Sequence, residues 1–391
     1  MNITILNNVF LKEDKTFDKE EAMKLCSKFA GVCYDKEGFN HINNEDKEKT
    51  LRRMNVTLDN GHHSVYDHIM INLNIENIPK ILAMFLNNEK EYTTSEKSLR
   101  YTKISSNNNI ISLKEEELYN KWVNIFNEII NIEYNQVLNS SKINKLSIEN
   151  ARYLTTVFIP TQMIYSTSLR QINYICSFMQ RYIYESKNEF DKKISSYMIE
   201  FINKLDKLNI LDERLMKNEK NRKLSLINNK NTYEDYFTEI YKTSYKGSFA
   251  QYAQAQRHRT LNYNFNLLND FEYYIPPILN SYSNLTSEWK NDMEKVKDIY
   301  PQGQLVNINE SGTYENFILK CKERLCSSAQ LEIALQTKET LNKYINSLKE
   351  YNEEMYQDIL NYSHGARCTF KDYRCSNDCK FLEGKRLTRK I

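Results

Sequence analysis

Glycine and proline are scarce in this chain, which has 8 and 5 of them among 391 residues. Because these two residue types dominate turns and low-complexity segments, their scarcity argues against a loop-rich or low-complexity protein. No apolar run in the sequence approaches the ~20 residues that a membrane-spanning helix requires. The composition therefore indicates a globular chain with one large or two ordinary domains.

An excess of one charge sign is also absent, since 54 basic residues are balanced by 51 acidic ones and the net charge is +3. Such a balance is not typical of a nucleic-acid-binding protein, although it allows a local basic pocket for a small anion. Aromatic residues are plentiful, and the 28 Tyr and 17 Phe supply a heavy aromatic core.

The start of the chain, MNITILNNVFLKEDK, turns polar too soon for the apolar segment of a secretory signal. We therefore expect a cytoplasmic protein, with reduced thiols at its eight cysteines.

Hydrophobic periodicity predicts a mixture of strands and helices in the first half of the chain. Alternation of polar and apolar residues predicts strands at 2–6 and 68–75. Helical spacing predicts helices at 20–29, 78–86, 115–132, 149–184 and 190–208, the fourth of them interrupted at Pro160.

A charged segment with few apolar residues, 212–230, is the predicted linker. After it the same succession recurs: an alternating stretch at 233–241 precedes predicted helices at 248–256, 317–326 and 329–348. A repeat of this size is typical of a duplicated domain rather than of a solenoid.

Four short segments and one arginine are candidates for binding an anion. The segments are 61–68 (GHHSVYDH), 96–101 (EKSLRY), 254–259 (QAQRHR) and 324–333 (RLCSSAQLEI), and the arginine is Arg152. Guanidinium groups such as those of Arg257 and Arg259 bind phosphate oxygens bidentately. Ser98 and Arg100 can offer a hydroxyl and a guanidinium to one phosphate. Gln254 shares a helix face with Arg257, where its amide can read a pyrimidine edge.

Each segment alone has an ordinary explanation. An Arg-His-Arg tripeptide is usually a solvated charged face, and the histidines at 62, 63 and 68 do not have the ligand spacing of a typical zinc site. The functional interpretation therefore depends on the order and joint spacing of the segments.

In that order the segments resemble the motifs of flavin-dependent thymidylate synthases: H-x-[ST]-x-x-E-H, Q-x-x-R-H-R, E-x-S-x-R-Y, A-R-x-x-L-P and R-x4-A-Q-x-E-I. The first half carries His62-x-Ser64-x-x-Asp67-His68, Glu96-x-Ser98-x-Arg100-Tyr101 and Ala151-Arg152, but has Asn88-Glu89-Lys90 in place of R-H-R. The second half keeps Gln254-x-x-Arg257-His258-Arg259 and Arg324-x4-Ala329-Gln330-x-Glu332-Ile333. It has lost E-x-S-x-R-Y, since 260–268 reads TLNYNFNLL, and Val296-Lys297 stands where Ala-Arg is expected. The losses of the two halves are complementary.

The resemblance implies an α+β fold with two tandem domains, each built of helices packed on a mainly antiparallel sheet. We expect the first domain at 1–211, the linker at 212–230, the second domain at 231–350 and a cysteine-containing tail at 351–391. Because the family's active site is assembled between subunits of a homotetramer, complementary losses imply a homodimer that imitates that tetramer.

The resemblance also implies a reaction: methylation of dUMP at C5 to give dTMP, with FAD as cofactor and with methylenetetrahydrofolate and NADPH as co-substrates. The implied substrate-binding residues are Glu96, Ser98, Leu99, Arg100, Arg152, Gln254, Arg257 and Arg324. The implied cofactor-binding residues are His62, Ser64, Arg257, His258 and Arg259. Ser98 and Arg324 are the catalytic candidates, with Arg324 at the pyrimidine carbonyl, where negative charge develops.

Other interpretations remain open. The same flavin chemistry could alkylate another pyrimidine nucleotide, such as UMP or dCMP, or transfer a hydroxymethyl group. A non-catalytic nucleotide- or flavin-binding homologue is a second alternative. An RNA-binding protein is disfavoured by the balanced charge.

The tail holds a further candidate site. His364, Cys368, Cys375 and Cys379 could form a small structural zinc site, although their spacing is not a usual one. A reduced, exposed tail or a locally packed cysteine cluster is the alternative, and no metal is part of the principal prediction.

Overall fold

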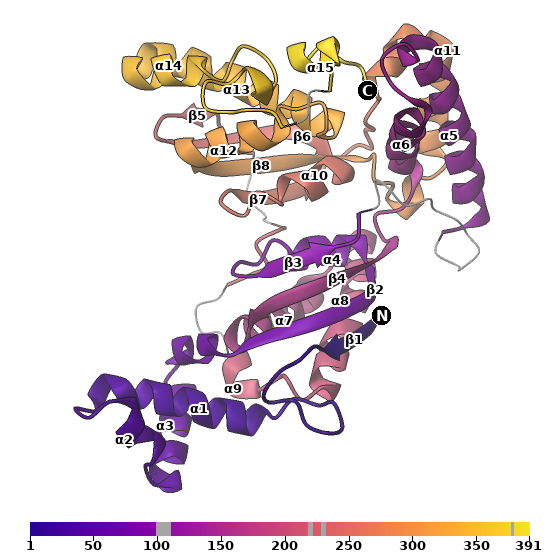
Figure 1. Cartoon of the computed structure of the whole chain (residues 1–391). Coiled ribbons are helices and arrows are strands. Elements are labelled where there is room, and N and C mark those ends of the chain that lie inside the picture. The colour runs from indigo at the N-terminus through magenta and orange to yellow at the C-terminus, as the bar shows by residue number, and fades with distance from the viewer. Residues whose placement is uncertain (99–110, 218–221, 228–231, 377–378) are drawn as a thin grey trace. The chain divides into compact units, whose positions relative to one another are not determined.

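The computed structural model describes residues 1–98, 111–217, 222–227, 232–376 and 379–391. It divides into two compact units (Figure 1): unit 1 contains Met1–Lys97 and Pro160–Ser225, and unit 2 contains Ser98–Ile159 and Leu226–Ile391. The predicted domain boundaries remain predictions. Leu99, Arg100 and Tyr101 of the EKSLRY segment lie outside the described residues.

Unit 1 is built on a four-stranded antiparallel sheet in the order β1-β2-β4-β3. The strands are β1 (Asn2–Ile5), β2 (Met70–Pro79), β3 (Thr93–Glu96) and β4 (Pro160–Ser168). The prediction that 149–184 is mostly helical was wrong over β4. There Thr161, Met163, Tyr165 and Thr167 alternate as buried residues, and this period of two is the pattern of a strand with one face in the core.

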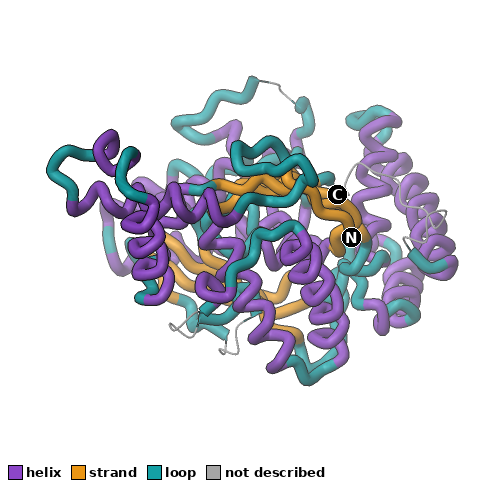
Figure 2. Tube along the Cα trace, turned by 90° about the horizontal axis from the view of Figure 1, so that it is seen from below, coloured by secondary structure: helices purple, strands orange, loops and turns teal. Residues whose placement is uncertain are grey.

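Helices cover this sheet and extend beyond it. Helices α4 (Lys80–Leu86), α7 (Leu169–Glu185) and α8 (Glu189–Lys207) contact the strands, and α7 packs along α8. Figure 2 shows helices lying along the strands of the sheets. The other helices of unit 1 are α1 (Lys19–Gly31), α2 (Phe39–Asn43), α3 (Lys47–Asp59) and α9 (Glu213–Met216).

Unit 2 repeats the strand order in a second antiparallel sheet, β5-β6-β8-β7. The strands are β5 (Tyr236–Phe237), β6 (Ile240–Ser248), β7 (Asn262–Leu267) and β8 (Leu305–Thr313). Helices α10 (Phe249–Ala255), α12 (Tyr314–Arg324) and α13 (Leu331–Tyr351) pack on it, and α14 (Glu353–Leu360) and α15 (Leu382–Arg386) follow. The predicted combination of helices with antiparallel sheets is confirmed.

A helical layer completes unit 2. It consists of α5 (Leu113–Tyr134), α6 (Ser140–Ala151) and α11 (Ser283–Glu294). Helix α5 begins at a capping box, in which Ser112 Oγ accepts from Glu115 N and the Glu115 side chain accepts from Ser112 N. The rings of Trp122 and Trp289 meet edge to face with centroids 4.8 Å apart, an arrangement that favours a fixed packing of α5 on α11.

None of the described helices is long and apolar enough to cross a membrane.

Candidate functional site

The QAQRHR segment starts on α10 and continues past the end of that helix. Ser248 is the N-cap residue of helix α10, and its Oγ accepts a hydrogen bond from Gln251 N at 3.0 Å. Gln254 is half-buried in the last turn, and beyond the helix Arg257 and Arg259 are exposed while His258 is only 4% exposed. The tripeptide thus directs two guanidinium groups outward and one imidazole inward.

Arg324, at the end of α12, contacts this segment. Its Nε donates to His258 Nε2 at 2.6 Å, and its Nη2 donates to the carbonyl oxygen of Gln254 at 3.3 Å. Two motifs that lie 66 residues apart therefore meet in one cluster. We call Gln254, Arg257, His258, Arg259 and Arg324 the arginine cluster.

The imidazole of His258 is neutral in this cluster. Burial and, to a smaller extent, the neighbouring cations Arg324 and Lys320 together lower the pKa of His258 to about 2. A neutral ring explains how His258 Nε2 accepts from a guanidinium, since a protonated imidazole has no acceptor atom.

A fully buried ion pair lies under the cluster. Lys320, four residues before Arg324 on α12, places its Nζ 2.6 and 2.8 Å from the two carboxylate oxygens of Glu310 on β8. Both side chains are 0% exposed. The hydroxyls of Tyr241 and Tyr245 also donate to Glu310, at 2.6 and 2.7 Å. This pair attaches α12 to the sheet. Neither Lys320 nor Glu310 belongs to one of the sequence motifs, so the sequence alone did not indicate the pair.

A second network joins Arg152 to the AQLEI part of the 324–333 segment. Arg152 Nη2 donates to Gln330 Oε1 at 3.2 Å, and both side chains are buried. Tyr153 OH donates to Glu332 at 2.8 Å, and Ser248 donates to the same carboxylate from its N at 2.8 Å and its Oγ at 2.6 Å. Burial raises the pKa of Glu332, while these hydrogen bonds oppose that rise. The network connects α6, α10 and α13 within unit 2.

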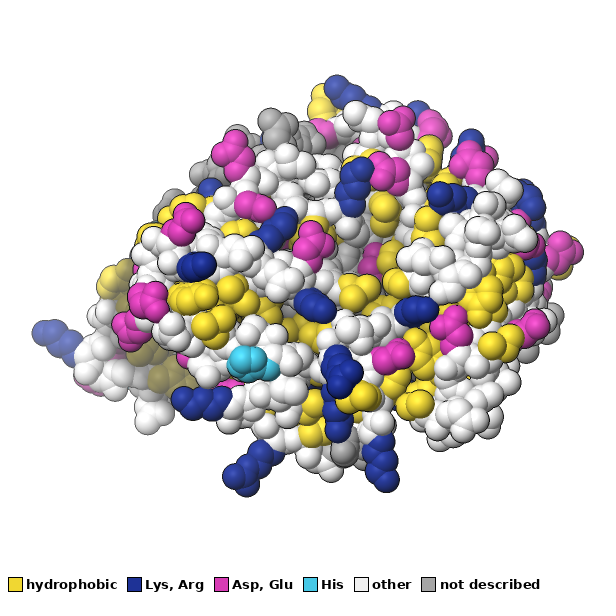
Figure 3. Space-filling model, turned by 90° about the horizontal axis from the view of Figure 1, so that it is seen from above, with side chains coloured by type: hydrophobic (Ala, Val, Ile, Leu, Met, Phe, Trp, Pro, Cys, Tyr) yellow, Lys and Arg dark blue, Asp and Glu magenta, His cyan; other side chains and the backbone are white. Residues whose placement is uncertain are grey.

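Basic and acidic side chains are interspersed on the face drawn in Figure 3. This distribution agrees with a local anion site rather than with an extended basic surface.

In the EKSLRY segment, Glu96 and Lys97 belong to unit 1, whereas Ser98 is the first residue of unit 2. Ser98 is exposed, two residues after the end of β3. The Glu96 side chain is 0% exposed, and its carboxylate accepts from Lys80 Nζ at 2.5 Å and from Asn87 Nδ2 at 3.1 Å. Ser95, Glu96 and Lys97 line a surface cavity of about 240 Å³.

The GHHSVYDH segment lies before β2. His62 and Ser64 are exposed, whereas His63 is buried, with Nε2 2.9 Å from the Leu58 carbonyl oxygen and Nδ1 3.0 Å from Tyr174 OH. Asp67 accepts from Ser168 Oγ at 2.5 Å, and so fastens the segment to the end of β4.

Asn88-Glu89-Lys90 follows α4 just as Arg257-His258-Arg259 follows α10. Glu89 is buried and accepts from Ser225 N at 2.5 Å and from Ser225 Oγ at 2.8 Å. Burial raises the pKa of Glu89 to about 7, against the lowering effect of those hydrogen bonds. A buried carboxyl group thus occupies the position of the buried imidazole.

Residues 15–182 match the family model of the thymidylate synthase complementing protein. The matched segment is less than half of the chain, and it is this segment that is similar to that family. The matched residues include the GHHSVYDH and EKSLRY segments and Arg152, whereas the arginine cluster lies outside them. No curated protein sequence matches the chain significantly.

Solved structures of thymidylate synthases are similar to parts of the chain. A structure of thymidylate synthase X from Helicobacter pylori with FAD and dUMP is 12% identical, with a TM-score of 0.31, and covers 55% of this chain and 99% of its own. A second structure from that organism, also with FAD and dUMP, has the same identity and TM-score and covers 54% of this chain. A structure of a UMP/dUMP methylase, PolB from Streptomyces cacaoi, is 13% identical, with a TM-score of 0.29, and covers 46% of this chain and 77% of its own.

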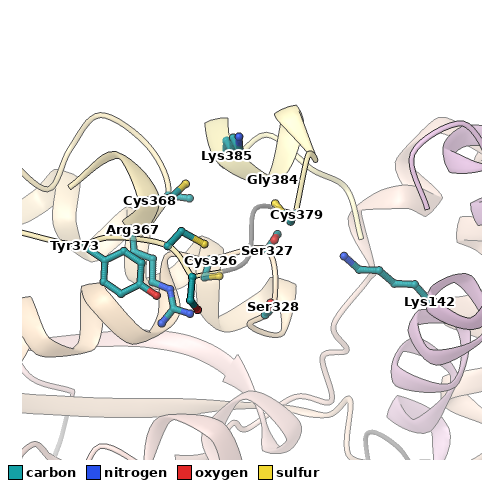
Figure 4. Close-up of a pocket in the computed structure, with 13 residues that line it drawn as sticks. Lys142, Cys326, Ser327, Ser328, Arg367, Cys368, Tyr373, Cys379, Gly384 and Lys385 are labelled. Atoms are coloured by element: carbon teal, nitrogen blue, oxygen red, sulfur yellow. The ribbon is translucent and has the colours of Figure 1, made fainter. Parts of the chain in front are cut away.

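The cysteines of the tail gather at a cavity in unit 2 (Figure 4). Cys368, Cys375 and Cys379 line this cavity of about 280 Å³ together with Cys326, whereas His364 is not among its lining residues. Within the described ranges, no group of three His, Cys, Asp or Glu side chains could hold a metal ion. The candidate zinc site of His364 and the three tail cysteines stays a prediction.

Proposed function

We propose that the chain is a flavin-dependent enzyme that methylates dUMP at C5 to give dTMP, with methylenetetrahydrofolate as carbon donor and NADPH as reductant. The observation that carries the proposal is the contact between Arg324 and the His258 and Gln254 positions. This contact brings together two motifs of the second half that lie outside the match to the family model, as is expected if both motifs contribute to one site.

The residues around the end of α10 fit a flavin nucleotide. Arg257 and Arg259 are exposed there, and guanidinium groups suit the oxygens of a pyrophosphate. The Gln256 side chain beside them is 2% exposed, and neither of its polar atoms has a hydrogen-bond partner within the described part of the chain. A buried amide of this kind requires a partner such as a bound ligand or an ordered water. When bound, a flavin supplies the hydride that this methylation requires.

The chain's own contribution is binding and electrostatics. We assign Arg324 to the pyrimidine carbonyl, where a fixed cation stabilises the negative charge that develops as C5 becomes nucleophilic. Gln254 and Arg257 are assigned to the nucleotide, together with Arg152 and, from the EKSLRY segment, Glu96, Ser98, Leu99 and Arg100. His62 and Ser64 are assigned to the flavin.

Two features support a tandem duplication with complementary losses. Both sheets have the same strand order, and a seven-residue helix follows the second strand of each, Lys80–Leu86 in α4 and Phe249–Ala255 in α10. The first residue of each helix also makes a corresponding contact with the fourth residue of the edge strand. In unit 1 this is the Lys80–Glu96 ion pair, and in unit 2 it is an edge-to-face pair of Phe249 and Phe265.

The reaction is tested by tritium release from 5-tritiated dUMP in the presence of methylenetetrahydrofolate, NADPH and FAD. Release that requires every component is expected. Release from UMP or dCMP derivatives alone would move the proposal to the alternative substrate. Bound flavin without turnover on any pyrimidine nucleotide would support the non-catalytic homologue. The proposed homodimer is tested by light scattering, which should give twice the mass of the chain.

A further inference from the structure

His258 differs from its two neighbours because its side chain is buried against Arg324 instead of exposed to solvent. Arg257 and Arg259 are exposed, whereas His258 is 4% exposed and its Nε2 atom is 2.6 Å from Arg324 Nε. We propose that His258 is a positioning residue that holds the Arg324 guanidinium through Nε2, rather than a ligand of the flavin. This role rests on the proposed function of Arg324.

The groups around His258 keep its ring in the form that this role requires. Arg324 and Lys320 are cations that oppose protonation, and Glu323 is the acidic group nearby, with Oε2 3.6 Å from Nδ1. Glu323 is about half exposed, so solvent weakens its influence. The neutral ring therefore carries its proton on Nδ1 and offers Nε2 as an acceptor.

The end of α10 provides the second acceptor for the same guanidinium. Arg324 Nη2 donates to the carbonyl oxygen of Gln254, one of the last carbonyls of α10, where a helix attracts positive charge. Two acceptors at different angles fix the plane of the guanidinium, whereas one acceptor would leave it free to rotate. Precise orientation matters because a misplaced catalytic group loses much of its effect.

Three variants distinguish the hydrogen-bond acceptor of His258 from the volume of its side chain and from the presence of Arg324. His258→Gln keeps an acceptor atom at the ε position, His258→Leu removes it at similar volume, and Arg324→Ala removes the group that is held. We expect His258→Leu to lower kcat for dTMP formation by roughly 10- to 100-fold, less than the ~100- to 1,000-fold loss seen when an oriented donor is removed outright, because Arg324 itself remains. His258→Gln should recover most of that loss, and the Kd for FAD should change less than threefold in both.

The decisive comparison is a double-mutant cycle. If His258 acts through Arg324, His258→Leu costs turnover in the parent chain and almost none in the Arg324→Ala background. An equal loss of kcat in both backgrounds, or a large loss of FAD affinity in His258→Leu, would overturn the proposal. His41→Leu, at an exposed histidine of unit 1, is the matched control and should leave kcat unchanged.

A second readout does not depend on turnover. The shifts in Tm for His258→Leu and Arg324→Ala should be less than additive in the double variant, because either change removes the same hydrogen bond. Additive Tm shifts would contradict the contact itself. If the parent chain shows no turnover, the proposed function fails while this thermal cycle still tests the His258–Arg324 hydrogen bond.

Discussion

Replacing Lys320 by Met removes the cation of the buried pair under the arginine cluster. Glu310 would keep the hydroxyls of Tyr241 and Tyr245 as donors, at 2.6 and 2.7 Å, but would lose both contacts to Nζ. Both members of the pair are 0% exposed, so water cannot replace the lost partner. Breaking a buried pair in this way costs ~3–5 kcal/mol.

Thermal unfolding converts this cost into a measurable shift. For a unit of this size, ~2–4 °C of Tm correspond to 1 kcal/mol, which predicts a decrease of ~6–20 °C for Lys320→Met. Circular dichroism or calorimetry would measure it. Lys246→Met is the matched control, because Lys246 is paired with Glu272 but both side chains are about half exposed. Exposed pairs contribute ~0–1 kcal/mol, so the control should shift Tm by at most ~4 °C.

A decrease in Tm for Lys320→Met no larger than that of Lys246→Met would contradict this cost for the buried pair. It would mean that Glu310 becomes protonated or solvated at little cost once Lys320 is absent. The double variant Lys320→Met/Glu310→Leu should regain part of the loss, because an apolar pair leaves no uncompensated charge.

Two further predictions concern single titratable groups. Burial raises the pKa of Glu89 to about 7. Between the pKa of the unfolded state and about 7, the folded state therefore keeps a proton that the unfolded state has lost. The free energy of unfolding falls as pH rises through this window, by up to ~3 kcal/mol. Glu89→Gln keeps an acceptor for Ser225 and should flatten the dependence of unfolding free energy on pH from 5 to 8, whereas an unchanged slope would contradict the assignment. Among the cysteines, Cys26, Cys176 and Cys321 are buried, and burial raises the pKa of each thiol. They should react with Ellman's reagent only after unfolding, while the exposed thiols react in the native protein, and rapid native labelling at these three positions would argue against their burial.

The sequence predicted the long helices well and some of the strands poorly. Helix α8 was expected at 190–208 and is found at Glu189–Lys207, because one face of it is continuously apolar. Strands β3, β4, β7 and β8 were not predicted. Strand β4 directly precedes α7, so its alternating residues were included in a helical pattern, and β7, NYNFNL, is too short and polar to be separated from a loop by periodicity.

The candidate site was predictable in composition but not in its contacts. The motifs identified Arg324, His258 and Gln254, yet only the fold shows that His258 is buried and accepts a hydrogen bond from Arg324. The Tyr153–Glu332 hydrogen bond joins residues 179 positions apart. Contacts of such separation depend on how helices pack on the sheet, which local sequence patterns do not encode.

The proposed role of Arg324 at the pyrimidine carbonyl is tested by comparing turnover and nucleotide binding in the parent chain and in Arg324→Ala. Tritium release from 5-tritiated dUMP gives kcat, and titration calorimetry gives the Kd for dUMP. This role of Arg324 predicts release that requires methylenetetrahydrofolate, NADPH and FAD in the parent chain, and a loss of kcat of ~100-fold or more in Arg324→Ala, since a cation at the developing charge is worth a few kcal/mol. The Kd should change much less. Equal losses in kcat and in dUMP affinity, or full turnover without Arg324, would contradict it.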